Sequence, residues 1–465
     1  MSGWAGKRVT VMGLGTRAGG VGVARYLAES GAIVTVTDLR SSAELAGPIA
    51  ELGGLDIRFV LGRHDPTDFT DANLVIRNPG VRRTNQYLAM AREAGVTIEM
   101  EMSIFLHACP APVIGITGTK GKTTTSALCG EMLRHWLPET VVAGNMGVSA
   151  VSALASITPE TPVVLELSSW QLEGMDERAI GPQIAMITNI SEDHLDTYRD
   201  FDDYAETKRS LGRHLSGDNI LVLNADDLEV AKAADQSVAR VIWFGAGTLP
   251  GSGIRVESDS LVSTIPGREG TIAIPDNQAL RGAHQHLNSA SAAASALLRG
   301  ASLEHVAAGL ASFDGVPNRM EVVAKVDGVL YVNDTAATAP AAAIASLRAF
   351  ADLPIHLIAG GADKRLDFGP LAREIAHLAA SITLLDGTAT PTLRSLIESA
   401  GRSDPGSVVQ SMSEAVERAS ARAAVGDVVL LSPGCASFGL FQDEFDRGAQ
   451  FREAVLARAA VGAGP

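Results

Sequence analysis

A stretch rich in glycine, lysine and threonine carries the clearest chemical signal in this sequence. It runs from Gly115 to Thr124 as Gly-Ile-Thr-Gly-Thr-Lys-Gly-Lys-Thr-Thr, between an apolar run and a helical pattern. In a loop of this composition the backbone N–H groups surround a β-phosphate, Lys122 neutralises phosphate charge, and the hydroxyl of Thr123 ligates Mg²⁺. Ile116 stands where the strict pattern has its first glycine, but the strand-to-helix context is kept. The stretch therefore predicts a loop that binds the phosphates of a nucleoside triphosphate.

Three polar residues downstream have the chemistry to complete such a site. Glu166 lies inside an otherwise apolar, strand-like run, and a buried carboxylate needs a metal ion or a cation as its partner. His194 ends Asn-Ile-Ser-Glu-Asp-His after the next strand-like run, where it could ligate a second Mg²⁺ or contact phosphate. Lys208 lies in a helical pattern, and that pattern alone favours a surface lysine. The first two residues thus predict metal ligands beside the phosphate loop.

A second glycine-rich turn lies near the N-terminus. It reads Gly13-Leu-Gly15-Thr-Arg-Ala18, between a strand-like run and a helical pattern, and Asp38 ends the next strand-like run. Glycines allow a tight turn and a close approach of backbone N–H groups to a diphosphate, while Asp38 could accept hydrogen bonds from a ribose or a base. Taken alone, the turn favours an NAD-dependent oxidoreductase, although any nucleotide diphosphate satisfies the same physics. An oxidoreductase would leave the phosphate loop downstream unexplained.

Alternating strands and helices must position both turns. Short β-branched runs separated by helical patterns predict parallel sheets with helices on their faces, an α/β fold. We expect strands at 8–12, 32–37, 74–76, 113–117, 163–167, 184–188, 219–223, 329–332, 354–359, 381–385 and 427–431. We expect helices at 22–30, 122–135 and 286–298, a helix that starts near Pro340, and loops with a small β-element at 245–270.

The length of the chain predicts several domains. Its 465 residues correspond to roughly three domains of about 150 residues each. The expected elements fall into three α/β groups, which we place at residues 1–109, 110–315 and 316–465. We expect a Rossmann-like N-terminal domain, a central P-loop ATPase-type domain and a Rossmann-like C-terminal domain.

Composition and charge limit the function further. Hydrophobic residues make up 46% of the chain and charged residues 20%, which is enough apolar material for several cores. Lys and Arg number 38 against 53 Asp and Glu, so the net charge is −15 and nucleic-acid binding through the overall field is not expected. Three scattered cysteines predict free thiols rather than disulfides or a zinc site. We expect a cytoplasmic protein without membrane insertion, because neither a signal peptide nor a long apolar stretch is evident, and we expect a monomer.

The motifs, in their order, resemble those of the Mur ligase family, the ATP-dependent amide-bond ligases of peptidoglycan precursor synthesis. The resemblance rests on the phosphate loop, on Glu166-Leu-Ser-Ser and on Asn189-Ile-Ser-Glu-Asp-His. It continues through Gly282-Ala-His-Gln-His-Leu-Asn, Pro317-Asn-Arg, Asn333-Asp, Gly360-Gly-Ala-Asp-Lys and Leu431-Ser-Pro-Gly-Cys-Ala-Ser, and so covers nearly the whole chain.

Within this family the chain is most similar to the member that adds D-glutamate to UDP-N-acetylmuramoyl-L-alanine. The first glycine turn with Asp38-Leu-Arg resembles the uridine-binding domain of that member, and the Asp-Asn-Pro-Arg signature of the diamino-acid-adding member is absent. The resemblance implies that this turn binds the UDP of the substrate rather than NAD. It also implies ATP and glutamate as the other substrates and two Mg²⁺ ions as cofactors.

The resemblance assigns roles to individual residues. Those implied to bind ATP are Gly118, Thr119, Lys120, Gly121, Lys122, Thr123, Thr124, Asn288, Arg319 and Asp334. Those implied to bind the UDP-substrate are Gly15, Thr16, Asp38, Leu39, Arg40, Asn78, Gly80, Asn145 and Ser168, and those for glutamate are Thr338, Lys364, Ser437 and Phe438. The implied catalytic residues are Lys122, Glu166, His194 and Lys208, and the implied metal ligands are Thr123, Glu166, His194 and Lys208. The family carries the last lysine as a carbamate, which turns a cation into an anionic ligand.

The implied reaction proceeds through an acyl phosphate. The alanine carboxylate is a poor electrophile, so its oxygen attacks the γ-phosphate of ATP and ADP leaves; the glutamate amine then attacks the carbonyl and phosphate leaves. Mg²⁺ and Lys122 would stabilise charge on the transferring phosphoryl group. The two carboxylates of glutamate need donors, which Thr338, Lys364 and Ser437 would supply. Closure of the domains around one cleft would protect the acyl phosphate from water.

Three departures from the family pattern leave alternatives open. Ala336 stands where this member often has a lysine, Gln285 replaces the usual asparagine, and the tail that begins at Phe438 is an uncommon version. Because Ala336 is close to the amino-acid site, L-glutamate remains an alternative to D-glutamate. A folylpolyglutamate-type ligase is a second alternative, against which the uridine-type N-terminal domain argues. A catalytically inactive UDP-sugar-binding protein is a third, which measurable ADP formation would exclude.

Overall fold

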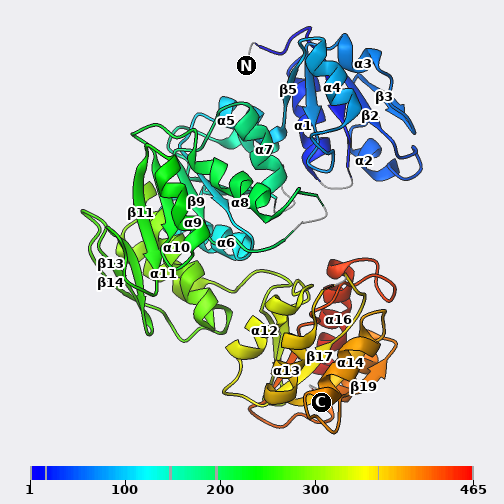
Figure 1. Ribbon diagram of the computed structural model, residues 1–465, viewed down its shortest axis with the longest axis vertical. Coiled ribbons are helices and arrows are strands. Elements are labelled where there is room, and N and C mark those ends of the chain that lie inside the picture. The colour runs from blue at the N-terminus through cyan, green and yellow to red at the C-terminus, as the bar shows by residue number, and fades with distance from the viewer. Residues whose placement is uncertain (1–2, 16–17, 146–148, 194–196, 365, 463–465) are drawn as a thin grey trace. The chain divides into compact units, whose positions relative to one another are not determined.

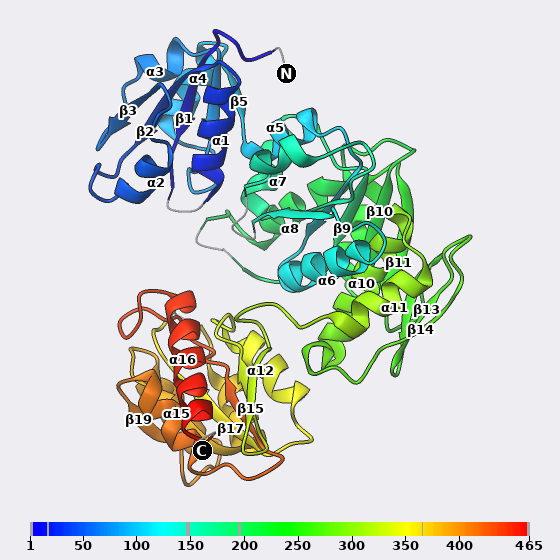
Figure 2. The same cartoon turned by 180° about the vertical axis from the view of Figure 1, so that it is seen from behind.

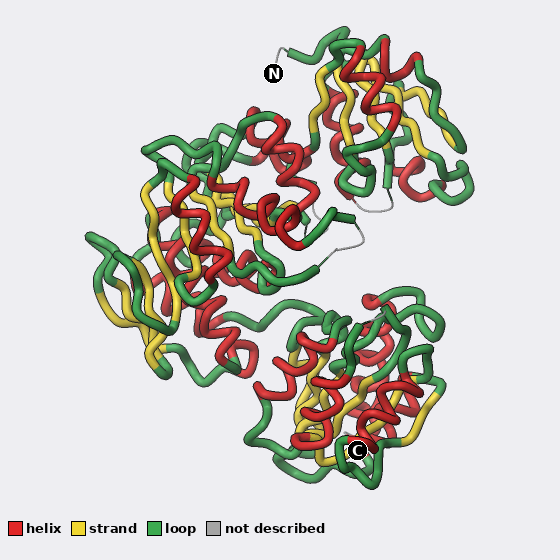
Figure 3. Tube along the Cα trace, viewed as in Figure 1, coloured by secondary structure: helices red, strands yellow, loops and turns green. Residues whose placement is uncertain are grey.

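The protein is a mixed α/β chain, as expected from its alternating patterns. The computed structural model describes residues 3–15, 18–145, 149–193, 197–364 and 366–462, whose strands form three sheets flanked by helices (Figure 3). Packing divides the chain into two compact units, residues 1–273 with 287–310 and residues 274–286 with 311–465. The first unit holds two of the sheets and the second unit holds the third.

The first sheet is parallel, in the order β3-β2-β1-β4-β5. Its strands are β1 (Arg8–Met12), β2 (Ile33–Asp38), β3 (Ile57–Leu61), β4 (Leu74–Arg77) and β5 (Thr97–Glu99), and the helices are α1 (Ala18–Glu29), α2 (Ala46–Glu51), α3 (Thr67–Thr70), α4 (Gln86–Glu93) and α5 (Glu101–Ala108). The strand order reverses at β1, so the turn after β1 opens where ligands bind in such sheets. Gly13 and Gly15 there have φ values of 87° and 74°, which suits a tight reversal.

The second sheet has the order β14-β13-β12-β11-β10-β9-β6-β8-β7. Its strands are β6 (Val113–Thr117), β7 (Val141–Gly144), β8 (Val163–Glu166), β9 (Ile184–Ile187), β10 (Ile220–Asn224), β11 (Arg240–Gly245), β12 (Gly253–Glu257), β13 (Ser260–Ser263) and β14 (Gly270–Ala273). The helices around it are α6 (Lys122–Arg134), η1 (Val151–Ser156), α7 (Ser169–Glu177), α8 (Phe201–Arg209), η2 (Ser210–Gly212), α9 (Leu228–Ala231), η3 (Lys232–Gln236), α10 (Ala283–Arg299) and α11 (Leu303–Ser312). Figures 1 and 2 show the antiparallel strands β13 and β14 at one edge of this sheet, beyond β11.

Strand β6 carries the phosphate loop because it lies in the buried middle of the second sheet. Every residue of Val113–Thr117 is buried, and the parallel neighbours of the strand are β8 and β9. Ile116 pairs with Glu166, and Thr117 pairs with Ile187. The carboxyl ends of three strands therefore meet, which places the loop after β6 beside the residues that follow β8 and β9.

The third sheet has the order β15-β16-β20-β17-β18-β19, antiparallel at β15–β16 and parallel elsewhere. Its strands are β15 (Glu321–Val326), β16 (Val329–Asn333), β17 (Ile355–Ala359), β18 (Ala379–Leu385), β19 (Ser407–Val409) and β20 (Val428–Leu431). The helices of this unit include η4 (Gln278–Leu280), α12 (Pro340–Ala349), α13 (Gly369–Leu378), α14 (Thr390–Ser399), α15 (Met412–Ser420) and α16 (Glu444–Gly462).

Local patterns locate most of these elements. The strand expected at 113–117 has those bounds, and Pro340 is the first residue of α12 as expected. Helix α1 begins at residue 18 rather than 22, and α10 at 283 rather than 286, because glycine and polar residues in a first turn carry little apolar periodicity. The patterns miss β3, β5, β7, β11, β15 and β19. All of these except β11 are edge strands, whose short or half-exposed runs give a weak signal.

One apolar core runs through both sheets of the first unit. Val9 beside β2 and β4, Phe105 of α5 and Leu165 of β8 belong to the same cluster of buried side chains. In the second unit, separate clusters around Leu357 and Leu385 belong to the third sheet. The shared core accounts for the packing of the first two sheets as a single compact unit.

Two expectations from composition can be compared with the structure. Cys129 and Cys435 are buried and Cys109 is partly buried, and all three are free thiols, as expected. Over the described residues, no helix combines the length and the apolar character that crossing a membrane would need.

A half-buried glutamate joins the two sheets of the first unit. Glu101, the first residue of α5, accepts hydrogen bonds from the Ser149 hydroxyl at 2.5 Å and from the backbone N–H of Val151 at 3.4 Å. Its Oε2 lies 2.7 Å from where a Cβ on Gly19 would be, so the first turn of α1 packs directly on it. Burial raises the pKa of Glu101 to about 7, although the hydrogen bonds from Ser149 and the nearby backbone oppose this.

The raised pKa of Glu101 predicts a pH-dependent stability. Folding holds a proton on Glu101 that the unfolded chain releases above its ordinary pKa of 4.5, so the contribution to stability is complete below that value and is lost as the pH rises through about 7. The lost free energy of unfolding is on the order of 3 kcal/mol. Glu101→Gln stays neutral and keeps an acceptor for Ser149. We expect its melting temperature to exceed that of the wild type increasingly from about pH 5 to about pH 8, whereas a constant difference would contradict the assignment.

Candidate active site

The loop after β6 has the backbone that phosphate binding requires. Gly118 and Gly121 have φ values of 147° and 80°, and a Cβ on Gly118 would lie 1.9 Å from Thr188 Oγ1. Lys122 is the first residue of α6, and its Nζ donates to the carbonyl oxygens of Gly118 at 2.9 Å and Thr119 at 3.0 Å. The lysine side chain therefore lies across the loop. Its charge and the N-terminus of α6 together favour an anion here.

The segment after β9 holds the phosphate loop in place. Thr119 N donates to Asn189 O at 2.8 Å, and Lys120 N donates to Asn189 Oδ1 at 2.8 Å. The hydroxyl of Thr188 donates to Lys120 O at 2.8 Å. These contacts fix a loop that has no regular secondary structure of its own. His194, which the sequence predicts as a metal ligand in the same segment, lies outside the described residues.

Glu166 has a carboxylate oxygen that makes no hydrogen bond. Its side chain is 2% exposed; Oε1 accepts from Asn145 Nδ2 at 2.9 Å, while Oε2 is buried without a partner among the described residues. Asn145 N donates to Glu166 O at 3.0 Å, which fixes the asparagine beside the carboxylate. A buried, unpaired carboxylate oxygen is costly without a cation, so Glu166 fits a Mg²⁺ site.

A Mg²⁺ ion at Glu166 would need further oxygen ligands from groups other than carboxylate, imidazole or thiol side chains. Within the described part of the chain, no three His, Cys, Asp or Glu side chains gather in a way that would hold a metal. Mg²⁺ is commonly bound by one or two carboxylates together with substrate phosphates and water, rather than by an all-protein cage. Thr123, half-buried in the first turn of α6, is a hydroxyl in a suitable place for such a site.

Lys208 is buried rather than on the surface that its helical pattern alone indicates. Its side chain is 1% exposed, and Nζ donates to Thr117 Oγ1, at the end of β6, at 3.1 Å. Burial lowers the pKa of Lys208 well below its usual value, and the charge of Lys122 lowers it further. Asp193 and Glu166 oppose the shift but do not reverse it. The structure thus places a lysine that favours its neutral form at the base of the phosphate loop.

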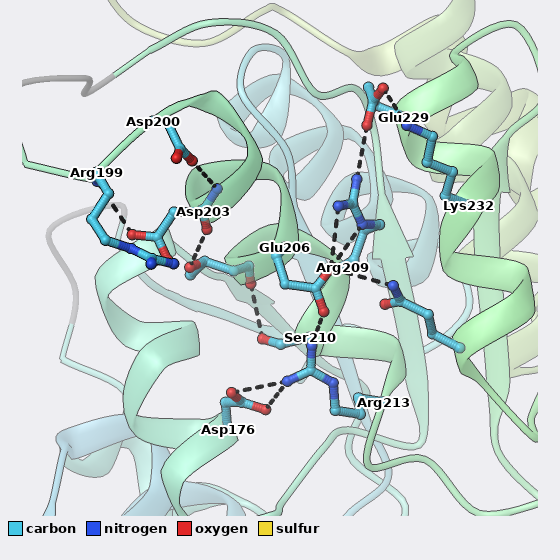
Figure 4. Close-up of polar contacts among 12 residues, drawn as sticks. Asp176, Arg199, Asp200, Asp203, Glu206, Arg209, Ser210, Arg213, Glu229 and Lys232 are labelled. Carbon is cyan, nitrogen blue, oxygen red and sulfur yellow. Dashed lines mark hydrogen bonds and ion pairs between the residues drawn. The ribbon is translucent and has the colours of Figure 1, made fainter.

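Ion pairs to neighbouring helices hold α8, the helix that carries this lysine (Figure 4). Arg209 donates to Glu206 Oε2 at 3.2 Å and to Glu229 Oε2 at 2.9 Å, which joins α8 to α9. Arg213 pairs with Glu206 and donates to Asp176 Oδ1 at 2.9 Å, which joins this region to α7. Single exposed ion pairs contribute little, but a connected set restrains the helix against its neighbours.

Asn288 packs against the phosphate loop from α10. It is buried, and its Oδ1 accepts a hydrogen bond from Thr125 Oγ1 at 3.3 Å, from a residue 163 positions away. A Cβ on Gly121 would lie 2.4 Å from the same oxygen, so only glycine leaves room there. The structure brings this predicted ATP-binding residue to the loop. Arg319 and Asp334, predicted for the same ligand, belong to the second unit.

A cavity of about 450 Å³ opens at the carboxyl edge of the first sheet. The predicted residues that line it are Gly15, Asp38, Leu39, Arg40, Asn78 and Gly80. Gly13, the first glycine of the predicted turn, also lines it. Further lining residues, which the sequence reasoning did not single out, are Met12, His64, Val81, Arg82, Thr84 and Asn85. Met12 ends β1 and the others follow β3 and β4; no motif marks them, because only the strand order brings these segments together.

The carboxylate of Asp38 is engaged by its own chain. Leu14 N donates to Oδ2 at 3.0 Å, and Arg40 donates from Nε to Oδ1 at 3.1 Å and from Nη2 to Oδ2 at 2.8 Å. Burial raises the pKa of Asp38, but the hydrogen bonds and charge of Arg40 outweigh burial and hold it below its ordinary value. An ionised Asp38 therefore shapes the glycine turn and orients Arg40 beside the cavity.

Two other residues predicted to contact the UDP-substrate, Asn145 and Ser168, are not among the described residues that line this cavity. Asn145 lies against Glu166 beside β8, as described above. Ser168 caps α7: its side chain accepts from Gln171 N, and the side chain of Gln171 bonds back to Ser168 N. Thr16 lies outside the described residues.

Three loops of the second unit meet at the carboxyl ends of β16, β17 and β20. Lys364 Nζ donates to Thr338 Oγ1 at 3.4 Å, which joins the loops after β16 and β17. A bridge between Ala362 and Ala436 brings the loop after β17 beside the loop after β20, which carries buried Ser437. Thr338, Lys364 and Ser437, three of the residues predicted to bind glutamate, thus lie on adjoining loops.

A buried arginine ties two of these loops to α16. Arg447 is fully buried and donates to Thr335 Oγ1 at 2.9 Å, to Thr335 O at 2.8 Å and to Cys435 O at 3.2 Å. Ala336, which replaces a common lysine, is half-buried one residue further along. Phe438, the fourth residue predicted to bind glutamate, is 62% exposed. Arg447 therefore fixes the backbone on which this predicted site depends.

Asp334 organises the same end of the sheet. Its carboxylate accepts hydrogen bonds from the hydroxyls of Ser346 and Ser432 and from the backbone N–H of Met320. Burial raises the pKa of Asp334 to about 6, against the effect of these hydrogen bonds and of the Arg319 charge. Arg319 itself is exposed. The carboxylate of Asp334 is thus occupied by hydrogen bonds within the protein, while the side chain of Arg319 is accessible to a ligand.

Most of this chain matches models of known protein families. Residues 116–296 match the Mur ligase middle domain, residues 318–435 match the Mur ligase glutamate ligase domain, and residues 7–99 match the MurD-like N-terminal domain of Mur ligases. A UDP-N-acetylmuramoylalanine--D-glutamate ligase of Roseiflexus sp. (strain RS-1) is 49% identical over 463 residues, covering 97% of this chain and 98% of that protein. The chain belongs to the Mur ligase family.

Other Mur ligases support the same assignment. A protein of the same name from Symbiobacterium thermophilum is 38% identical over 97% of this chain and 98% of its own length. The crystal structure of the UDP-N-acetylmuramate-alanine ligase MurC from Thermotoga maritima has a TM-score of 0.61 at 21% identity, covering 97% of this chain and 99% of that chain. The MurF ligase of Thermotoga maritima, in complex with ADP, has a TM-score of 0.58 at 17% identity, covering 92% and 96%. Both structures share the Mur ligase fold with this chain.

Proposed function

We propose that this Mur ligase joins D-glutamate to UDP-N-acetylmuramoyl-L-alanine with ATP, through an acyl phosphate, in peptidoglycan precursor synthesis. The observation that carries the proposal is the 49% identity, over nearly the whole of both chains, to a ligase of that name. The buried side chains of Glu166 and Lys208 at the base of the phosphate loop support the ATP-dependent step, because phosphoryl transfer depends on charged groups held in fixed positions. We place the enzyme in the cytoplasm as a monomer, with domains at residues 1–109, 110–315 and 316–465.

Residues around β6 would hold ATP and its metal ions. The loop from Gly118 to Thr124 would surround the phosphates, and Lys122 would place its charge against them. Thr123 and Glu166, with His194 and a carbamate on Lys208, would ligate two Mg²⁺ ions, which supply positive charge that stabilises the transferring phosphoryl group. The unpaired Oε2 of Glu166 supports its role as a ligand. Asn288, Arg319 and Asp334 would contact or organise the rest of the nucleotide.

The environment of Lys208 supports its conversion to a carbamate. A carbamate forms when an unprotonated amine adds to carbon dioxide, and burial with a nearby lysine favours the unprotonated amine. The product is an anion, which would suit a position near Lys122 and the proposed Mg²⁺ ions. Asn145, fixed by Glu166, would contact the UDP-substrate beside the same site.

The two remaining substrates would bind at the first and third sheets. The UDP of the substrate would occupy the first-sheet cavity, where Gly15, Asp38, Leu39, Arg40, Asn78 and Gly80 lie, while Thr16 and Ser168 complete the predicted set. Glutamate would bind at Thr338, Lys364, Ser437 and Phe438. A lysine ammonium and two hydroxyls are suitable donors for its two carboxylates.

We expect a substitution of Arg447 to weaken the binding of glutamate without weakening the binding of the UDP-substrate. Arg447→Met leaves three buried acceptors without a donor, which costs about 3 kcal/mol of stability and loosens the loops at residues 335 and 435. We expect a lower melting temperature and a KM for glutamate raised at least about tenfold, with little change in the KM for the UDP-substrate. The matched control is Arg452→Met on the same helix, which removes a partly exposed ion pair with Glu321. An unchanged KM for glutamate in a folded Arg447→Met variant would contradict the role.

Phosphate release from Mg-ATP with UDP-N-acetylmuramoyl-L-alanine tests the proposed activity. Parallel reactions contain D-glutamate, L-glutamate or no amino acid. Release that depends on D-glutamate is expected, and it would make Ala336 a tolerated variation. Release that depends on L-glutamate would keep the ligation but correct its stereochemistry. If neither amino acid supports release, the proposed substrates are wrong.

A further inference from the structure

His64 is held in one orientation beside the first-sheet cavity. It follows β3 and lines the cavity together with residues after β1, β2 and β4. Its Nδ1 lies 2.7 Å from Thr37 Oγ1, and its ring meets Phe69 and Tyr87 edge-on, with centroids 5.8 Å and 5.0 Å away. Thr37 and Phe69 are fully buried. The imidazole therefore has little freedom to turn.

The hydroxyl of Thr37 determines which nitrogen of His64 carries the proton. Thr37 Oγ1 lies 3.2 Å from Arg63 O, a carbonyl that can only accept. A hydroxyl has a single proton, so both hydrogen bonds form together only when Thr37 donates to Arg63 O and His64 Nδ1–H donates to Thr37 Oγ1. Nε2 then carries a lone pair.

The remaining nitrogen of His64 is available to a ligand. Nε2 has no hydrogen-bond partner among the described residues, and it is not one of their buried, unsatisfied atoms. Burial lowers the pKa of His64, and the charge of Asp38 opposes this shift without reversing it. The ring therefore stays neutral at physiological pH and offers an acceptor at the edge of the cavity.

We propose that His64 Nε2 accepts the N3–H of a uracil base and so selects uridine over cytidine nucleotides in this cavity. The inference rests on the proposed function, in which the cavity binds the UDP of the substrate. Uracil has an N–H at position 3, whereas cytosine has a lone pair there. A fixed acceptor bonds the first and repels the second, and a polar group left unpaired on binding is what makes such discrimination strong.

Binding of UDP and CDP to the full-length protein tests this inference by calorimetry. The wild type is expected to bind UDP at least about tenfold more tightly than CDP. His64→Ala removes the acceptor, and the preference should fall to within about twofold, through a larger loss of UDP than of CDP affinity. Thr37→Val keeps the size of the side chain but removes the hydroxyl that fixes the tautomer of His64. It should therefore also reduce the preference for UDP over CDP. His377→Ala, an exposed histidine of α13, is the matched control and should keep the wild-type preference.

Each remaining outcome identifies what fails. An unchanged preference in folded His64→Ala and Thr37→Val proteins would overturn the role of His64 while leaving the proposed function intact. Equal losses of UDP and CDP affinity would also overturn it, since His64 would then contact a group that the two nucleotides share, such as a ribose hydroxyl. A wild-type protein that binds neither nucleotide would instead overturn the assignment of the cavity to UDP. If His64→Ala fails to fold, Thr37→Val alone decides between the first two outcomes.

Discussion

Lys122→Ala abolishes phosphate release from ATP, with an expected loss of at least about 1000-fold in kcat. Lys122 is the loop lysine at the start of α6, and its Nζ bonds two carbonyl oxygens of the phosphate loop. Removal of the side chain therefore takes away the charge that we propose to face the phosphates, together with two hydrogen bonds that hold the loop. A steady-state assay of phosphate release with all three substrates measures the effect.

The control for this variant is Lys325→Ala, which removes an exposed lysine from β15. It should retain the wild-type rate. UDP binding by Lys122→Ala should also be unchanged, because the first-sheet cavity contains no part of the phosphate loop. If Lys122→Ala releases phosphate at the wild-type rate, the phosphate-loop assignment is wrong.

Lys208→Ala loses most of its activity and recovers part of it when short-chain carboxylates are added. Lys208 is buried beside Thr117, and its burial favours the neutral amine from which a carbamate forms. Alanine leaves a space in which acetate or a similar anion can replace the lost carboxylate. We expect a loss of at least about 100-fold and a saturable, partial rescue, measured as phosphate release over a series of acid concentrations.

Two comparisons test whether the added acid replaces the missing carbamate. Lys122→Ala should not respond to the same acids, because it lacks a cation. Formate, acetate and longer acids should differ in the concentration needed, because the space left by the lysine is limited. Full activity of Lys208→Ala without any added acid would show that no carbamate is required.

The strand, loop and helix around Gly115 to Thr124 could be predicted from local pattern. A run of apolar, β-branched residues predicts a buried strand, and the glycines mark the turn before a helix that begins at Lys122. The place of Glu166 in an apolar run predicted a metal ligand beside the loop, and family resemblance added Lys208 to the same site. Neither the orientation of their side chains nor their surroundings follows from a pattern, because the partners lie 21 and 91 positions away.

His64 illustrates what motif reasoning misses. His64 follows β3, an edge strand whose half-exposed residues give no clear strand pattern in the sequence. No motif surrounds His64. Asp38 illustrates a different limit: the pattern marks it as a ligand for ribose or base, but its carboxylate bonds Leu14 and Arg40 within the protein. The contact with Leu14, 24 positions away, can be recognised only when residues distant in the sequence have been placed side by side.

The sequence by itself determined the α/β class, the phosphate loop and membership of the Mur ligase family, because these depend on local periodicity, turn chemistry and the order of motifs. Only the tertiary structure decided that Lys208 is buried, that Glu166 keeps an unpaired oxygen beside Asn145, and that His64 offers an acceptor to the first-sheet cavity. The physical reason is strand order. Parallel strands that are not consecutive in the chain place their carboxyl ends side by side, so the loops that follow them form one site whose members have no fixed spacing in the sequence.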